Sequence, residues 1–334
     1  MKRRILYIDI IKVLALLFVI YNHTHQVLIS SRMHIRIIHN SLFYLSKSAV
    51  PLFFMASGIL LMNKNDSLKK IIKRILRVLI PLIIITVIWT YMHARDIDLL
   101  QMINPYSINY FPYWLWFLQS MILIYICLPL IRKITLKYEN FNIFRILIIG
   151  SLIVFSIFFT IFNIIFKKNQ LIITNLLPMP FLYFIYGYLL SMKKNKKSLV
   201  NISLINLLIT LIVPTFIATK FMLLKKSYLF LDDYKNIYSF IIATSLFIII
   251  KYFFENYNKD NIFTKIITHL SNNSYGIYLI HVFSVEFILN MPFIKKLSEF
   301  HKLECIFIII TLVIIVNDIL ISILRQIPGI KKLL

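Results

Sequence analysis

The chain consists of long apolar stretches separated by short, mostly basic segments. Two of the stretches, Val78 to Trp89 and Cys305 to Val316, have almost no side chain that favours water. A helix that crosses the hydrocarbon core of a bilayer needs about 20 apolar residues. The pattern therefore predicts about ten transmembrane helices, at residues 5–25, 41–62, 75–93, 113–131, 143–165, 171–191, 202–222, 238–254, 274–293 and 305–324.

The basic residues predict how these helices are oriented. If the N-terminus is cytoplasmic, 23 of the 37 lysine and arginine residues fall in the inner segments and 12 in the outer ones. Positive charge accumulates on the cytoplasmic side of membrane proteins, so both the N- and the C-terminus are predicted to be cytoplasmic. No linker or shift in composition marks a boundary. We therefore expect one transmembrane domain over residues 1–334, without a soluble extracellular domain.

Composition supports a membrane protein and excludes several other classes. The chain is 60% hydrophobic and 15% charged, with a mean hydropathy of +0.82, whereas a soluble domain carries roughly 25% charged residues. The net charge of +24 does not predict nucleic-acid binding, because short basic loops between apolar helices are explained by topology and anionic lipid. Cys127 and Cys305 lie in apolar segments without metal-ligand spacing, so no metal site is expected.

The first predicted helix carries three ionisable residues, Asp9, Lys12 and His23. Eleven residues of helix bring His23 to within about 20° of the face of Lys12 and roughly 16 Å further along the axis. Asp9 precedes Lys12 by one turn and can pair with it. These residues either line the bundle interior, where membrane proteins keep functional charges, or reach out to the two interfaces.

Two further groups of polar residues admit both a functional and a structural interpretation. Ser274, Tyr278 and His281 share one face of the ninth helix, where a histidine can be a structural hydrogen-bonding residue. Arg74 and Arg77 lie one turn apart at the start of the third helix. They are either a topology signal or a binding site for phosphate, because a guanidinium group can donate two hydrogen bonds to a phosphate. Glu286 and Asp318 are membrane charges without an evident partner.

Several segments together resemble the membrane acyltransferase 3 family. In its first helix a basic residue precedes a histidine by ten intervening positions, as Lys12 precedes His23, although the family commonly has arginine at the first position. The resemblance extends over nearly the whole chain, in AVPLFFMASGILL (Ala49 to Leu61), RILR (Arg74 to Arg77), WLWFL (Trp114 to Leu118), FLYFIYGYLL (Phe181 to Leu190) and SYGIYLIH (Ser274 to His281).

The resemblance implies an O-acyltransferase, most often an O-acetyltransferase, that uses acetyl-CoA or another acyl-CoA. The acceptor would be a hydroxyl of a cell-surface or lipid-linked carbohydrate, and the chain would act alone or with partner proteins of polysaccharide synthesis. On this hypothesis Arg74 and Arg77, assisted by Lys12, hold the phosphates of coenzyme A. His23 is the general base, and Asp9 orients Lys12. His281 and Tyr278 are secondary candidates, for donor binding or, in the case of His281, proton relay.

A proton-coupled transporter or flippase of a sugar or lipid-linked oligosaccharide is the alternative interpretation. Charged residues within membrane helices also suit such a carrier, but the sequence has neither an inverted repeat nor a pair of glycine-broken helices, which many carriers show. The abundance of Ile, Lys and Asn suggests an AT-rich bacterial genome. The expected location is therefore the bacterial cytoplasmic membrane.

Overall fold

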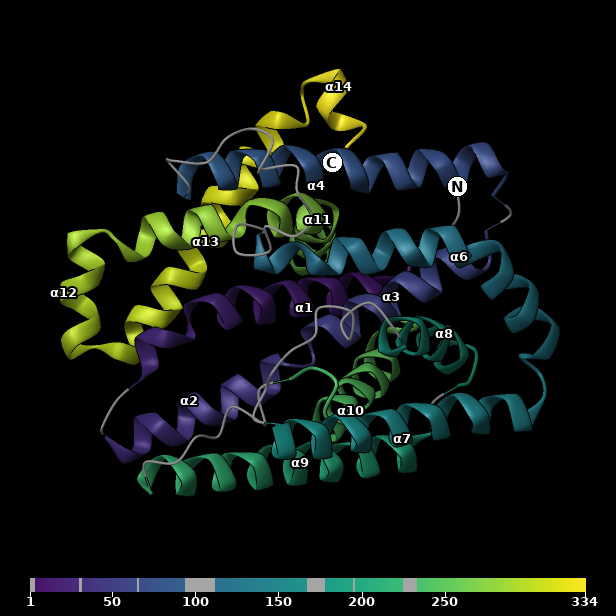
Figure 1. The fold of residues 1–334 in the computed structure, drawn as a ribbon, viewed down its shortest axis with the longest axis horizontal. Helices are drawn as coiled ribbons and strands as arrows, with labels where there is room; N and C mark the ends of the chain where they lie inside the picture. Colours follow the sequence, from purple (N-terminus) through teal and green to yellow (C-terminus); the bar gives the residue numbers. More distant parts are fainter. Residues whose placement is uncertain are drawn as a thin grey trace.

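The computed structural model describes residues 4–29, 32–64, 66–93, 112–166, 178–194, 196–224 and 233–334, and its regular elements in these ranges are all helices (Figure 1). This confirms the all-α prediction. The helices are α1 (Leu6–Thr24), η1 (His25–Leu28), α2 (Met33–Ser46), α3 (Ala49–Met62), α4 (Leu68–His93), η3 (Tyr113–Leu115), α6 (Trp116–Tyr138), α7 (Asn142–Phe166), α8 (Met179–Ser191), α9 (Lys197–Leu223), α10 (Ile237–Phe254), α11 (Ile262–Leu289), α12 (Pro292–Phe300), α13 (Lys302–Leu324) and α14 (Pro328–Lys331).

Seven helical stretches in the described ranges are long and apolar enough to cross a membrane, and the pair α11 and α12, bent by 77°, makes an eighth. The multi-pass prediction is confirmed, but the predicted number of ten is not. The two remaining predicted spans correspond to α4 and α8. The first part of α4 is basic up to Arg77, and α8 has only 13 residues. The beginning of the predicted sixth span, residues 171–177, lies outside the described residues.

Helix α1 lies in the interior of the bundle and contacts α2, α3, α10, α11 and α13 (Figure 1). Its side chains Ile11, Ala15 and Ile20 are fully buried. A helix that is surrounded by lipid gains little free energy when its apolar side chains are buried against other helices. Membrane helices associate instead through close packing and interhelical hydrogen bonds. The polar residues of α1 are therefore placed inside the protein rather than towards lipid.

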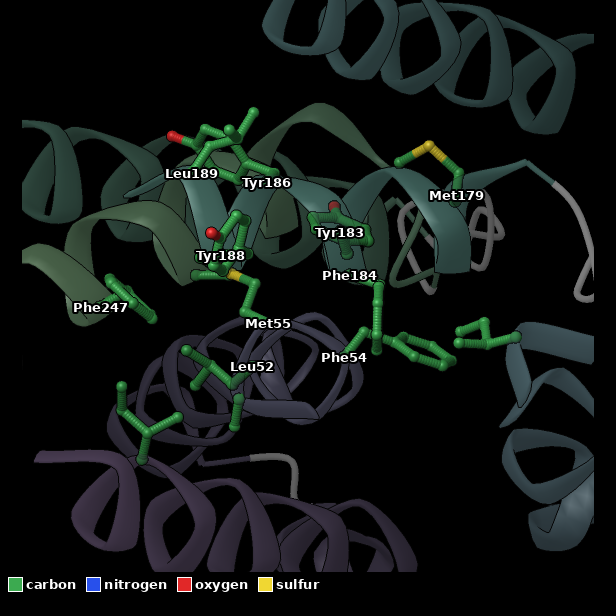
Figure 2. Close-up of a cluster of buried hydrophobic side chains, with 14 of the residues drawn as sticks. Leu52, Phe54, Met55, Met179, Tyr183, Phe184, Tyr186, Tyr188, Leu189 and Phe247 are labelled. Carbon is green, nitrogen blue, oxygen red and sulfur yellow. The ribbon is translucent and has the colours of Figure 1, made fainter. Parts of the chain in front are cut away.

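Helices α3 and α8 cross in close contact, and their apolar side chains meet at the crossing (Figure 2). Two glycines make this approach possible. A Cβ atom on Gly58 would lie 1.9 Å from the carbonyl oxygen of Phe184, and one on Gly187 would lie 2.3 Å from Cα of Met55. Small residues commonly permit such approach between membrane helices. The predicted second and sixth helices thus form one tightly packed unit, which lies against α1 through α3.

Both ends of the described chain lie at the same end of the bundle. Arg4, just before α1, donates a hydrogen bond of 3.1 Å to the carbonyl oxygen of Thr268 in the first part of α11. Arg325, just after α13, donates one of 2.7 Å to the carbonyl oxygen of Asn272 in the same helix. An even number of crossings produces this arrangement. Which side of the membrane this end faces remains a prediction.

Candidate functional site

Helices α1 and α11 pack side by side and run parallel, and their polar residues meet at two levels. At one level Lys12 contacts Ser271, and at the other the ring of His23 lies beside that of His281. We call these the cation level and the histidine level. Eleven residues of continuous helix separate Lys12 from His23, or roughly 16 Å along the axis. Both side chains contact α11, as expected of residues that share one helix face.

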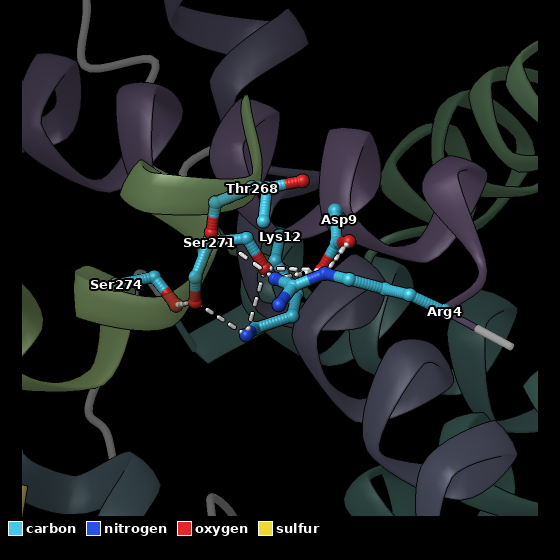
Figure 3. Close-up of polar contacts among 6 residues, drawn as sticks. All are labelled: Arg4, Asp9, Lys12, Thr268, Ser271 and Ser274. Atoms are coloured by element: carbon cyan, nitrogen blue, oxygen red, sulfur yellow. Dashed lines mark hydrogen bonds and ion pairs between the residues drawn. The ribbon is translucent and has the colours of Figure 1, made fainter. Parts of the chain in front are cut away.

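The cation level is built around Asp9, whose ion pair in the structure is with Arg4 (Figure 3). Nε and Nη2 of Arg4 donate to the two carboxylate oxygens at 2.6 and 3.0 Å. The hydroxyl of Ser271 donates to Asp9 at 2.5 Å and accepts from Nζ of Lys12 at 3.0 Å. The expected direct pairing of Asp9 with Lys12 is therefore replaced by a bridge through Ser271, because Arg4 folds back over the first turn of α1.

Further cations surround Lys12. Arg4, Arg77 and Arg325 all lie within electrostatic reach of its ammonium group, and Asp9 is the one acidic residue that acts on it among the described residues. The cation level therefore carries an excess of positive charge, which favours an anionic ligand. Arg4 and Arg325 were not predicted as site residues, because nothing in the sequence separates them from the other basic residues that flank the helices.

The two arginines of α4 have different surroundings. Arg74 pairs with Asp66 at 3.3 Å, and Arg132 of α6 pairs with the same carboxylate at 2.8 Å. Burial raises the pKa of Asp66, but the hydrogen bonds from Arg132 and Arg74 outweigh it and hold that pKa below its ordinary value. Arg77 instead has an exposed side chain that donates to the carbonyl oxygen of Leu333 at 3.4 Å. The predicted pair is thus divided between an ion-pair cluster and the cation level.

At the histidine level, the ring centroids of His23 and His281 are 5.0 Å apart. His281 is fully buried, and its Nδ1 lies 2.7 Å from the carbonyl oxygen of Tyr278. Because a carbonyl oxygen only accepts, Nδ1 carries the hydrogen and Nε2 presents a lone pair. Among the described residues, none is a hydrogen-bond partner of this Nε2. Two imidazoles, one of them with a fixed tautomer, therefore face each other.

Tyr278 belongs to the histidine level, one turn before His281 on α11. Its ring stacks on His281 at a centroid distance of 5.8 Å, and its hydroxyl donates to the carbonyl oxygen of Trp114. Tyr278 is thus placed away from the cations, with its hydroxyl already engaged. Ser274 lies between the two levels, and its hydroxyl donates to the carbonyl oxygen of Ser271 at 2.8 Å. Both residues are buried and support α11.

The two charges without an evident partner in the sequence have partners in the structure. Glu286 pairs with His93 of α4 at 3.4 Å, and Asp318 pairs with His269 at 2.8 Å. Each contact joins two helices, and it is an ion pair when the histidine is protonated. Among the described residues, no three His, Cys, Asp or Glu side chains gather in a way that could hold a metal ion.

The family model described as an acyltransferase domain matches residues 5–322, which includes every helix that builds the two levels. The chain belongs to the acyltransferase 3 family. No curated protein and no solved structure matches it. As a membrane acyltransferase, it combines a positively charged level with a level at which an imidazole can accept a proton.

Proposed function

We propose that this membrane acyltransferase moves an acyl group, in the first place acetyl, from cytoplasmic acyl-CoA to a hydroxyl of a cell-surface or lipid-linked carbohydrate. The observation that carries this proposal is the two-level arrangement on α1 and α11. A cluster of cations suits the phosphates of coenzyme A, and a pair of imidazoles roughly 16 Å further along α1 suits proton transfer at the thioester. The pantetheine arm of the donor would connect the two levels.

The donor would be held at the cation level by Arg77, Lys12 and Arg325. Hydrogen bonds between charged groups, such as guanidinium and phosphate, are about twice as strong as those between neutral groups. Arg77 suits this role because its guanidinium contacts a backbone carbonyl instead of a carboxylate. Arg74 would act indirectly, by fixing the first part of α4 through Asp66. Asp9 and Ser271 would orient the ammonium of Lys12.

His23 would be the general base at the histidine level. It removes the proton of the acceptor hydroxyl as the oxygen attacks the thioester carbonyl carbon, and a C–O bond forms. The C–S bond then breaks, and the proton held by His23 passes to the leaving sulfur, so that the products are an ester and the thiol of coenzyme A. His281 supports this step, because its Nε2 lone pair can share the proton of His23.

The experiment that tests the proposal uses the protein reconstituted in liposomes with labelled acetyl-CoA on the face that carries the cation level. Coenzyme A should be released only when a carbohydrate acceptor is supplied on the other face, and the label should appear on that acceptor. Transport of a sugar without any release of coenzyme A would contradict the proposal and favour the carrier.

A further inference from the structure

Aromatic residues gather beside the histidine level, where α4, η3 and α11 meet. The ring of Trp114 lies 4.5 Å from that of Trp89 and 5.4 Å from that of Tyr113. Trp114 also donates from Nε1 to the carbonyl oxygen of Leu279 at 3.4 Å, which fixes its position against α11. The cluster is therefore a platform built from three separate parts of the chain.

Tyr113 is the exposed member of this platform. This residue is 59% exposed, whereas Trp114 and Trp89 are buried. The ring centroid of Tyr113 lies 5.6 Å from that of His23, and Glu286 is within electrostatic reach of its hydroxyl. An accessible aromatic ring thus neighbours both the proposed general base and a carboxylate.

Glu286 and His93 complete the group. Their side chains are 3.4 Å apart, and that of Glu286 is 42% exposed, so that its carboxylate keeps free hydrogen-bonding positions towards solvent. His93 stacks on Trp89 at a centroid distance of 3.8 Å, and its Nδ1 lies 3.0 Å from the carbonyl oxygen of Trp89. Because Nδ1 is engaged by a carbonyl, Nε2 is the atom that Glu286 orients.

We propose that Tyr113 and Glu286 bind the sugar ring of the acceptor, with His93 orienting the carboxylate of Glu286, and that this ring is a neutral pyranoside. The apolar C–H face of a pyranose packs on an aromatic ring, while its hydroxyl groups donate to a carboxylate, and charge makes those hydrogen bonds stronger. The carboxylate of Glu286 would repel an acidic sugar at this position. The inference rests on the proposed function, because it places the sugar hydroxyl beside His23.

Sugar binding can be measured without any acyl donor, because the three tryptophans of the chain, Trp89, Trp114 and Trp116, lie in or next to this region. Purified protein would be titrated with the methyl glycosides of glucose, galactose, mannose and N-acetylglucosamine, and with methyl glucuronide, while tryptophan fluorescence is recorded. We expect at least one neutral glycoside to give a saturable change, and methyl glucuronide to bind at least tenfold more weakly.

Variants then assign the site. Tyr113→Ala and Glu286→Gln should each raise the dissociation constant of the neutral glycoside at least tenfold. Tyr91→Ala is the matched control, because Tyr91 lies on α4, is 76% exposed and has no side-chain hydrogen bond or ring contact with any of the described residues. Absence of saturable binding by every glycoside, or equal affinity in Tyr113→Ala and wild type, would overturn the inference. If Tyr113→Ala and wild type bind the glycoside equally well, Tyr113 is an aromatic anchor at the membrane interface.

The titration separates this inference from the proposed function. Glycoside binding that depends on Tyr113, in a protein that never releases coenzyme A, would support the sugar site and contradict acyl transfer. Acyl transfer to a carbohydrate that is unchanged in Tyr113→Ala and Glu286→Gln would support the proposed function and place the acceptor elsewhere.

Discussion

At the scale of single residues, the two arginines of α4 show how similar side chains come to have different roles. Arg74 and Arg77 are one turn apart and match the same family segment, yet Arg74 pairs with Asp66 while Arg77 lies near Lys12. The sequence predicts their common helix face. It does not reveal Asp66 as a partner, because that contact depends on how the loop before α4 folds towards α6.

The proposed donor site makes a prediction about Arg77. Arg77→Ala should weaken binding of coenzyme A by about 1.5–3 kcal/mol, because it removes charge-assisted hydrogen bonds to phosphate. Lys69→Ala is the control, since it removes one positive charge two turns earlier on the same helix. Isothermal titration of the purified protein with coenzyme A measures both. If Arg77→Ala and Lys69→Ala bind coenzyme A with equal affinity, Arg77 does not bind the donor and acts only as a topology signal.

Asp66 gives a prediction about pH. Its folded pKa is below the unfolded value of 3.8, so its ion pairs stabilise the folded protein fully above about pH 4 and this stabilisation is lost as the pH falls through the folded pKa. Asp66→Asn should therefore lower the Tm at pH 7, and the difference from wild type should shrink below pH 4. Thermal unfolding in detergent measures it, and a difference that does not depend on pH would contradict this assignment.

At the scale of helices, hydrophobic periodicity predicts where most helices lie but not how they meet. The ten predicted ranges all overlap observed helices. The contact of His23 with His281 could not be predicted, because the register between α1 and α11 is set by packing along their whole length. The bend after Leu289 has a local signal in Pro292, which begins α12. A proline favours the first turn of a new helix.

The crossing of α3 and α8 predicts a strong effect of one methyl group. Gly58→Ala should destabilise the protein by about 1–3 kcal/mol, the usual cost of overpacking a core, because the new Cβ would meet the backbone of Phe184. Gly150→Ala on α7 is the control, since no atom of the described residues lies within 4 Å of the position of its Cβ. Thermal unfolding of both variants should show a lower Tm for Gly58→Ala alone. A similar Tm for the two would mean that α3 and α8 are further apart.

At the scale of the whole molecule, the arrangement of charge predicts how the protein lies in the membrane. The cation level and both ends of the described chain share one end of the bundle, and acyl-CoA is cytoplasmic. The predicted cytoplasmic location of this end is thus a condition for the proposed direction of transfer. The sequence shows how lysine and arginine are distributed between the inner and outer segments. It does not reveal that Arg4, Arg77 and Arg325 converge around Lys12.

Labelling with a membrane-impermeant thiol reagent tests this orientation. A cysteine at Lys296, on α12, should react from outside, whereas cysteines at Lys69 and Lys194 should react only after the membrane is permeabilised. All three positions are exposed, so differences in reactivity report the side of the membrane. Cys127 and Cys305 are replaced beforehand. The reverse pattern would contradict the direction of transfer.

The most direct test of the account compares two histidines at the end of α1. His23 faces His281, whereas the ring of His25 packs on Phe43 and His39 at centroid distances of 4.9 and 5.5 Å, in another part of the bundle. If His23 is the general base, His23→Ala should lower turnover, measured as acceptor-dependent release of coenzyme A, by about 10²–10⁴-fold. Its affinity for coenzyme A should stay close to that of wild type, and His25→Ala should retain most of the turnover. Full turnover in His23→Ala would contradict the mechanism.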